Sequence, residues 1–270
     1  MVVQHNLTAM NTNRQLGITT NAQSKSTEKL SSGYRINRAG DDAAGLSISE
    51  KMRSQIRGLD KASTNAQDGI SAIQTAEGAL NEVHSILQRM NELSTQAAND
   101  TNTDTDRIAI ADELTALTEE IDRIQSTTQF NTMNLLDGNF TGKKLQVGAL
   151  EGQTIDIDIE NMSAAQLGVD NLDVTDNDNA GQSMTSVQEA IEKVSTQRSK
   201  LGAIQNRLEH TIANLDTTSE NTSAAESRIR DVDMAEEMVS YSKNNILAQA
   251  GQSMLAQANQ SNQGVLSLLQ

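Results

Sequence analysis

The 270-residue sequence contains no cysteine, no proline and no tryptophan. Without cysteine, the chain has neither disulfides nor thiolate metal ligands. Without proline, nothing in the sequence forbids very long helices. The few aromatic residues are Tyr34, Phe130, Phe140 and Tyr241. A core must therefore be built from Leu, Ile, Val, Met and Ala, which suits seams between helices better than a deep pocket.

Basic charge and long apolar runs are also scarce. The chain has 36 acidic and 21 basic residues and a formal net charge of −15, which argues against a nucleic-acid partner. No run is long and apolar enough for membrane insertion. The first 20 residues lack the apolar core of a signal peptide and hold a single basic residue, Arg14. If the protein leaves the cell, we expect export without a cleaved signal peptide.

Catalytic and metal-binding motifs are missing as well. His5, His84 and His210 are far apart in the sequence, and no HExxH motif, phosphate-binding loop or Gly-x-Ser-x-Gly elbow occurs. The acidic run in 161–183 could alternatively be a calcium-binding loop. Such a loop needs ligands at alternate positions, Gly at its sixth position and Glu at its twelfth, and no alignment of this segment meets that pattern. We therefore expect no enzyme activity, no cofactor and no metal.

The middle of the chain is dominated by helical periodicity. Apolar and small residues alternate at steps of three and four from Leu59 to Ala97, as in a coiled-coil seam. Asp42 is a candidate N-cap for this helix. A turn at 99–106 leads to a second, antiparallel helix, and 161–183 reads as a loop. A third helix is then predicted from positions that recur every seven residues: Val187, Val194, Leu201, Leu208, Leu215, Thr222 and Ile229.

One short segment has the period of a β-strand. Residues 143–160 alternate apolar and polar side chains around a Gly-containing turn, which predicts a β-hairpin. Leu145–Val147 would pair near Ile155–Ile159. The predicted fold is thus mainly α, a long coiled-coil-like helical bundle with a small β-hairpin element.

Both chain ends carry apolar residues that need a partner. A helix at a free chain end frays unless something docks it, so we expect the N- and C-terminal helices to pair with each other and with other copies. The residues expected to make these assembly contacts are Leu7, Met10, Ile246, Leu247, Met254, Leu255, Val265, Leu266 and Leu269.

Five separated stretches resemble bacterial flagellin: SSGYRINRAGDDAAGLSIS (31–49), LQRMNEL (87–93), TQFN (128–131), GQTIDIDI (152–159) and AQAGQSMLAQANQ (248–260). The resemblance spans the whole chain and implies a structural subunit of the swimming filament. Residues 1–42 and 235–270 would then line an inner tube, and 43–234 would form the rod. Residues 161–183 leave no room for the family's variable outer domain.

The resemblance also implies partners and a location. Family members pass through the flagellar type III export channel, use an export chaperone, a filament cap and hook-associated proteins, and end up in the extracellular filament. Relatives are also ligands of the flagellin-sensing Toll-like receptor, through a patch that doubles as a subunit contact. The matching positions here are Gln88, Arg89, Glu92, Leu93 and Glu113. By heptad phase, Arg89, Leu93 and Glu113 lie beside the Met90 seam rather than in it, which predicts a surface position.

Two other functions remain open from the sequence. A hook-filament junction protein shares related terminal segments and would occur in few copies. A cytoplasmic helical signalling or tethering protein is compatible with the periodicity, although the apolar helices at both ends fit it poorly. The chain also departs from many relatives in ending Leu-Leu-Gln without a nearby proline, which leaves the geometry of the terminal helix open.

Overall fold

The computed structural model describes residues 6–267, and their side chains as far as Gln260. The chain divides into two compact units. The first runs to Ser54 and resumes at Asn221, and the second is Gln55–Glu220. The helices are α1 (Leu7–Ser32), α2 (Ala43–Ala97), α3 (Asp104–Thr127), α4 (Ala164–Leu167), α5 (Asn177–Arg230) and α6 (Met234–Ser267).

Helix α2 begins where the sequence predicts. The backbone N–H of Gly45 donates to Asp42 Oδ1 over 2.9 Å, so Asp42 satisfies one of the amides that every helix start leaves unpaired. From there α2 continues for 55 residues, roughly 80 Å at 1.5 Å per residue.

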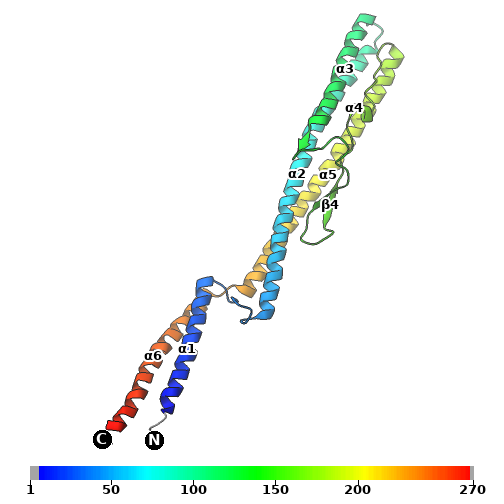
Figure 1. Ribbon diagram of the computed structural model, residues 1–270. Helices are drawn as coiled ribbons and strands as arrows, with labels where there is room; N and C mark the ends of the chain where they lie inside the picture. The colour runs from blue at the N-terminus through cyan, green and yellow to red at the C-terminus, as the bar shows by residue number, and fades with distance from the viewer. Residues whose placement is uncertain (1–5, 268–270) are drawn as a thin grey trace. The chain divides into compact units, whose positions relative to one another are not determined.

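The second unit is a bundle of α2, α3 and the part of α5 that precedes Asn221, and these helices lie side by side in Figure 1. Helix α3 starts with a capping box, in which Thr103 and Asp106 bond each other's backbone N–H groups. The predicted seams lie in the core: on α5, Val187, Val194, Leu201 and Leu208 are all fully buried. The mainly α, coiled-coil-like fold is therefore confirmed.

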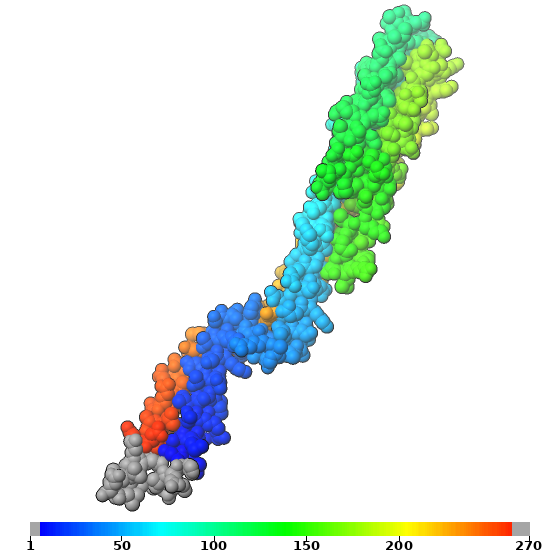
Figure 2. All heavy atoms as spheres, in the orientation of Figure 1, coloured from blue at the N-terminus to red at the C-terminus, as the bar shows by residue number. Residues whose placement is uncertain are grey.

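A β-hairpin packs on the side of α2. Strands β3 (Lys143–Gln146) and β4 (Thr154–Ile157) are antiparallel, with Leu145 opposite Ile155. Figure 2 shows this green segment against α2, where Asn65 Nδ2 donates to the Gln146 carbonyl over 3.2 Å. The predicted hairpin is confirmed. Gly69 of α2 faces Leu145 of the hairpin.

A second, shorter hairpin precedes it. Strands β1 (Gln129–Phe130) and β2 (Met133–Asn134) are joined by Asn131 and Thr132. Both joining residues have positive φ, 47° and 64°. Two consecutive left-handed residues form the tight turn that matches the twist of paired strands.

The segment 161–183 is more ordered than the loop that the sequence suggests. It contains α4, and α5 begins at Asn177, inside the acidic run. The Asp173 carboxylate accepts from the Thr175 N–H over 2.9 Å, and the Ser183 hydroxyl donates to the Asp173 carbonyl over 2.8 Å. These bonds anchor the start of α5. The loop prediction was wrong because this first turn is polar and shows no apolar period.

In the first unit, α1 and α6 run antiparallel, side by side (Figure 1). Asn6 Nδ2 donates to the Ala258 carbonyl over 2.9 Å at one end, and Lys29 pairs with Glu237 over 3.4 Å at the other. The predicted pairing of N- and C-terminal helices is confirmed.

Candidate interaction surfaces

The pair of helices α1 and α6 has almost no core of its own. Among the described side chains of these two helices, the buried ones are Ser26, Ala248 and Ala258, all small. Large apolar residues point to solvent instead, and Leu7, Met10 and Ile246 are each about two-thirds exposed, at 69%, 64% and 66%. Two helices joined through small residues bury little apolar area, so their contact is weak.

The terminal residues that the sequence singles out are therefore largely available to partners. Leu247 and Met254 are exposed, and Leu255 is half-buried. Val265, Leu266 and Leu269 lie outside the residues whose side chains are described. The sequence reasoning missed Val239, which is 70% exposed. Its spacing of seven from Ile246 would have identified it as part of the same apolar stripe.

A charged surface joins α2 and α3. Arg89 pairs with Glu113 over 2.9 Å and with Glu92 over 3.2 Å. The hydrogen bond to Glu113, followed by that to Glu92, raises the pKa of Arg89. These side chains are exposed, as is Gln88, so four of the five predicted contact residues form one surface cluster.

Leu93 does not belong to that surface. Its side chain is 2% exposed and lies in the core with Met90, so the predicted surface position was wrong. A helix in a two-stranded seam buries a narrow stripe, but α2 packs against two helices and a hairpin, and its buried face is wider. Leu93, three residues after Met90, falls within this wider face.

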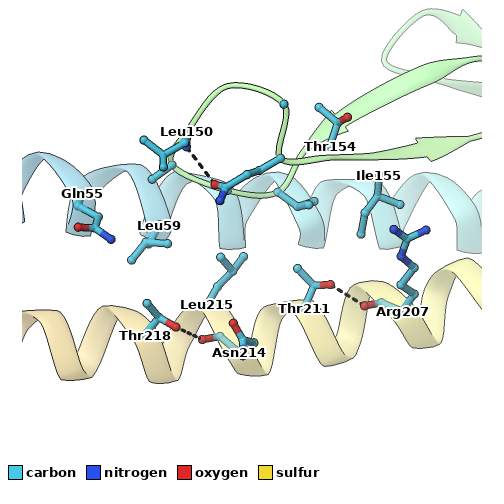
Figure 3. A pocket seen from close by; sticks show the side chains of 15 residues that line it. Gln55, Leu59, Leu150, Thr154, Ile155, Arg207, Thr211, Asn214, Leu215 and Thr218 are labelled. Atoms are coloured by element: carbon cyan, nitrogen blue, oxygen red, sulfur yellow. Dashed lines mark hydrogen bonds between the residues drawn. The ribbon is translucent and has the colours of Figure 1, made fainter.

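A cavity of about 400 Å³ lies between the β3–β4 turn, α2 and α5 (Figure 3). Its lining combines apolar residues such as Leu59 and Leu215 with amides and hydroxyls, and Arg207 is its charged residue. The Thr211 hydroxyl donates to the Arg207 carbonyl over 2.8 Å, and the Thr218 hydroxyl donates to the Asn214 backbone carbonyl over 2.8 Å. Two of its hydroxyls are thus bonded within α5, and the lining contains no acid or histidine.

Over the described part of the chain, no group of three or more His, Cys, Asp or Glu side chains is arranged to hold a metal ion. Within the same residues, no helix combines the length and the apolar character needed to cross a membrane.

Comparison with known proteins matches both ends of the chain. Residues 3–141 match the family model described as the bacterial flagellin N-terminal helical region. Residues 184–269 match the bacterial flagellin C-terminal helical region. The interval between the two matches, 142–183, holds the β3–β4 hairpin and α4, so this is a small form without a large outer domain.

Full-length relatives are similar over the whole chain. The flagellin of Halalkalibacterium halodurans is 59% identical and that of Bacillus subtilis 54%, each with all of both chains covered. The flagellar filament 31.3 kDa core protein of Treponema maltophilum is 50% identical, also over all of both chains.

Solved structures are similar over shorter stretches. The crystal structure of Bacillus cereus flagellin aligns at a TM-score of 0.52 and 32% identity, over 60% of this chain and 94% of that one. A flagellar hook-associated protein from Vibrio parahaemolyticus aligns at 0.60, over 71% of this chain and all of that one, but at 13% identity it shares the fold alone. Two family regions that cover most of the sequence, together with full-length relatives above 50% identity, place this chain in the bacterial flagellin family.

Proposed function

We propose that this protein is a structural subunit that polymerises into the bacterial flagellar filament and so serves swimming motility. One observation carries the proposal: α1 and α6 pair through small residues and leave Leu7, Met10, Ile246 and Met254 exposed. Each large apolar side chain that a neighbour covers contributes about 1.5–3 kcal/mol. Repetition of this gain along a polymer stabilises the assembly.

In this proposal the two ends and the middle have different tasks. Residues 1–42 and 235–270 form the inner tube of the filament, where copies cover one another's apolar faces. Residues 43–234 form the rod around it. The net charge of −15 keeps the free subunit soluble and gives the assembled rod a negative exterior.

The route to the filament and the partners along it belong to the same proposal. The subunit is exported without a cleaved signal peptide and is bound by a flagellar export chaperone. It is added to the filament beneath the filament cap, and the first subunits bind to the hook-associated proteins. These partners rest on family membership. Each would bind the same apolar faces of α1 and α6 that the polymer later covers.

Polymerisation tests the main proposal. Removal of 240–270 should leave a soluble, helical protein that forms no filaments in negative-stain microscopy. A finer test replaces Ile246 by Asp, with Ile246→Leu as the matched control that keeps an apolar side chain of equal size. The Asp variant should fail to polymerise and the Leu variant should succeed. Filaments from the truncated protein would refute the proposal.

We also propose a secondary role as a ligand of the flagellin-sensing Toll-like receptor, through the exposed cluster Gln88, Arg89, Glu92 and Glu113. Arg89 is the centre of that cluster, because it pairs with an acid on each of two helices. In a receptor reporter assay with purified monomer, Arg89→Ala should lower the response. Arg123→Ala, which removes a comparable exposed arginine paired with Glu120, is the control. Equal activity of both variants would exclude this assignment.

A hook-filament junction protein is the alternative, since such proteins share the fold. The two functions differ in copy number. A filament subunit is the main protein of sheared filaments, whereas a junction protein occurs there in traces, and protein quantification of sheared material distinguishes them.

A further inference from the structure

Methionine supplies all the sulfur of this protein. The chain has ten methionines and no cysteine, and these two residue types are the ones that peroxides oxidise step by step. A peroxide that reaches the chain therefore meets thioethers and no competing thiol. Because susceptibility follows exposure, the positions of the methionines in the fold decide which of them react.

The second unit shelters most of its methionines. Met90 is completely buried and Met162 is 3% exposed, both in the core. Met184 on α5 is half-buried. Met133 on β2 differs from them, since it is 44% exposed. Peroxide should therefore oxidise Met133 well before it reaches the core of this unit.

The two terminal helices present their methionines to solvent instead. Four such side chains, here called the terminal methionines, are about half exposed or more. They are Met10 on α1 at 64%, and Met234, Met238 and Met254 on α6 at 49%, 49% and 58%. The buried side chains described for these helices are Ser26, Ala248 and Ala258. A change at the terminal methionines should therefore leave the contact between α1 and α6 in place.

Met10 and Met254 lie at one end of the helix pair. Met10 is three residues after Leu7, on the same side of α1. Met254 is seven residues after Leu247, also on one side of its helix. Both leucines are exposed. The N-cap of α1 donates to the Ala258 carbonyl, so the two thioethers lie at the same end, each within an exposed apolar face.

Met234 and Met238 lie at the other end of the pair, where Lys29 bonds Glu237. They are four residues apart and are therefore neighbours on one side of α6. Exposed thioethers thus occur at both ends of the surface that neighbouring copies are proposed to cover.

Oxidation makes such a side chain polar without changing its charge. The thioether sulfur bonds one oxygen of hydrogen peroxide as the O–O bond breaks. The sulfur is oxidised by two electrons to the sulfoxide, and the departing hydroxide takes the proton of the transferred hydroxyl and leaves as water. The sulfoxide oxygen is a hydrogen-bond acceptor, and its burial without a donor is unfavourable.

We propose that the terminal methionines are sites of reversible oxidation by peroxides in the free subunit, and that the sulfoxides block its addition to a polymer. This inference rests on the proposed function, because the sulfoxides act on contacts between copies. Methionine sulfoxide reductases, one for each sulfoxide epimer, reverse the step. A dithiol reductant becomes a disulfide, the oxygen leaves as water, and the subunit regains its capacity to assemble.

Peroxide treatment of the monomer, followed by peptide mass spectrometry, tests which sites react. The terminal methionines and Met133 should be oxidised first, and Met90 and Met162 last. The circular dichroism spectrum should stay that of a helical protein. The critical concentration for polymerisation should rise about tenfold or more, and both reductases together should restore the starting value.

A variant with leucine at the four sites separates the terminal methionines from the others. Leucine is apolar and similar in volume, so Met10→Leu/Met234→Leu/Met238→Leu/Met254→Leu should polymerise equally well before and after peroxide. Met133→Leu is the matched control. It removes an exposed thioether of the second unit, and peroxide should still block its polymerisation.

Two results would overturn the inference and leave the filament function intact. One is oxidised protein that polymerises at the untreated critical concentration, and the other is equal inhibition of the four-site variant and the wild type. If the four-site variant forms no filaments before treatment, the reductases decide: oxidised Met133→Leu protein that they fail to restore would refute the inference. Failure of the unmodified protein to polymerise under any condition would overturn the proposed function as well.

Discussion

Ala149, at the turn of the β3–β4 hairpin, lies directly against Gly58 of α2. A Cβ added to Gly58 would come within 2.8 Å of the Ala149 Cβ and 3.3 Å of its Cα. Neither atom can move aside without moving the backbone, so Gly58→Ala should destabilise the protein by about 1–3 kcal/mol. Urea unfolding followed by circular dichroism measures this loss.

Gly78 on the same helix is the matched control for that substitution. A Cβ there would meet no heavy atom within 4 Å, so Gly78→Ala should stabilise the protein by about 0.5–1 kcal/mol through helix propensity alone. The prediction is that the two identical changes have opposite signs. The same sign for both would show that Ala149 does not restrict Gly58.

The α5 seam should be sensitive to loss of volume. Leu201 is completely buried in the core, and Leu201→Ala should cost about 2–5 kcal/mol, because the lost contacts are accompanied by a cavity. Leu150→Ala, at a largely exposed leucine, should change the stability of the monomer by less than about 0.5 kcal/mol. A similar loss in both would contradict the described core.

The β1–β2 turn contains a β-branched residue in a conformation that disfavours it. Thr132 has φ 64° and follows Asn131 at φ 47°, where Asn-Gly is the preferred pair. Thr132→Gly should therefore stabilise the protein by about 1 kcal/mol, measured as a higher urea midpoint. Asn131→Ala, which introduces an unfavourable residue into the same turn, should have the opposite effect. The Thr132 hydroxyl donates to the Asn131 carbonyl over 2.6 Å, and a destabilising Thr132→Gly would mean that this bond outweighs the backbone strain.

The start of α3 should weaken in acid. Hydrogen bonds from the Thr103 hydroxyl and then its backbone N–H hold the pKa of Asp106 below its usual value. A carboxyl with a lowered pKa stabilises the folded state above the ordinary aspartate pKa. It loses that contribution as the pH falls through the folded-state value. Asp106→Asn should therefore flatten the stability profile below about pH 4. Asp112→Asn, at an exposed position on the same helix, should change it less.

The long helices were predictable because their pattern is regular and local. Val187, Val194, Leu201 and Leu208 recur every seven residues, and all four are buried. A repeat of this length is hard to produce by chance and is independent of what the helix packs against. The hairpin was predictable for a similar reason, since Ile155, Ile157 and Ile159 alternate with polar residues and are buried together.

The features that the sequence did not predict depend on what packs around each element. By heptad phase, Leu93 lies beside the Met90 seam. It is buried because α2 packs against more than one element, and the sequence of α2 alone does not show how many elements cover it. The start of α5 at Asn177 is likewise stabilised by Asp173 and Ser183 across a polar turn. Neither residue belongs to an apolar period. The exposed cluster around Arg89 was identified by resemblance, and its pairing with Glu113 required the antiparallel register of two helices.

Two glycines of α2 leave space for side chains of the β3–β4 hairpin. Gly58 and Gly69 are eleven residues apart, about three helical turns, so they lie on one face, and each receives a side chain from the hairpin, Ala149 and Leu145 respectively. A displacement by one residue would drive both side chains against a Cβ-bearing position. The two contacts therefore fix the position of the hairpin along the axis of α2. A force applied to the hairpin is transmitted to α2, because the hairpin cannot slide along the helix.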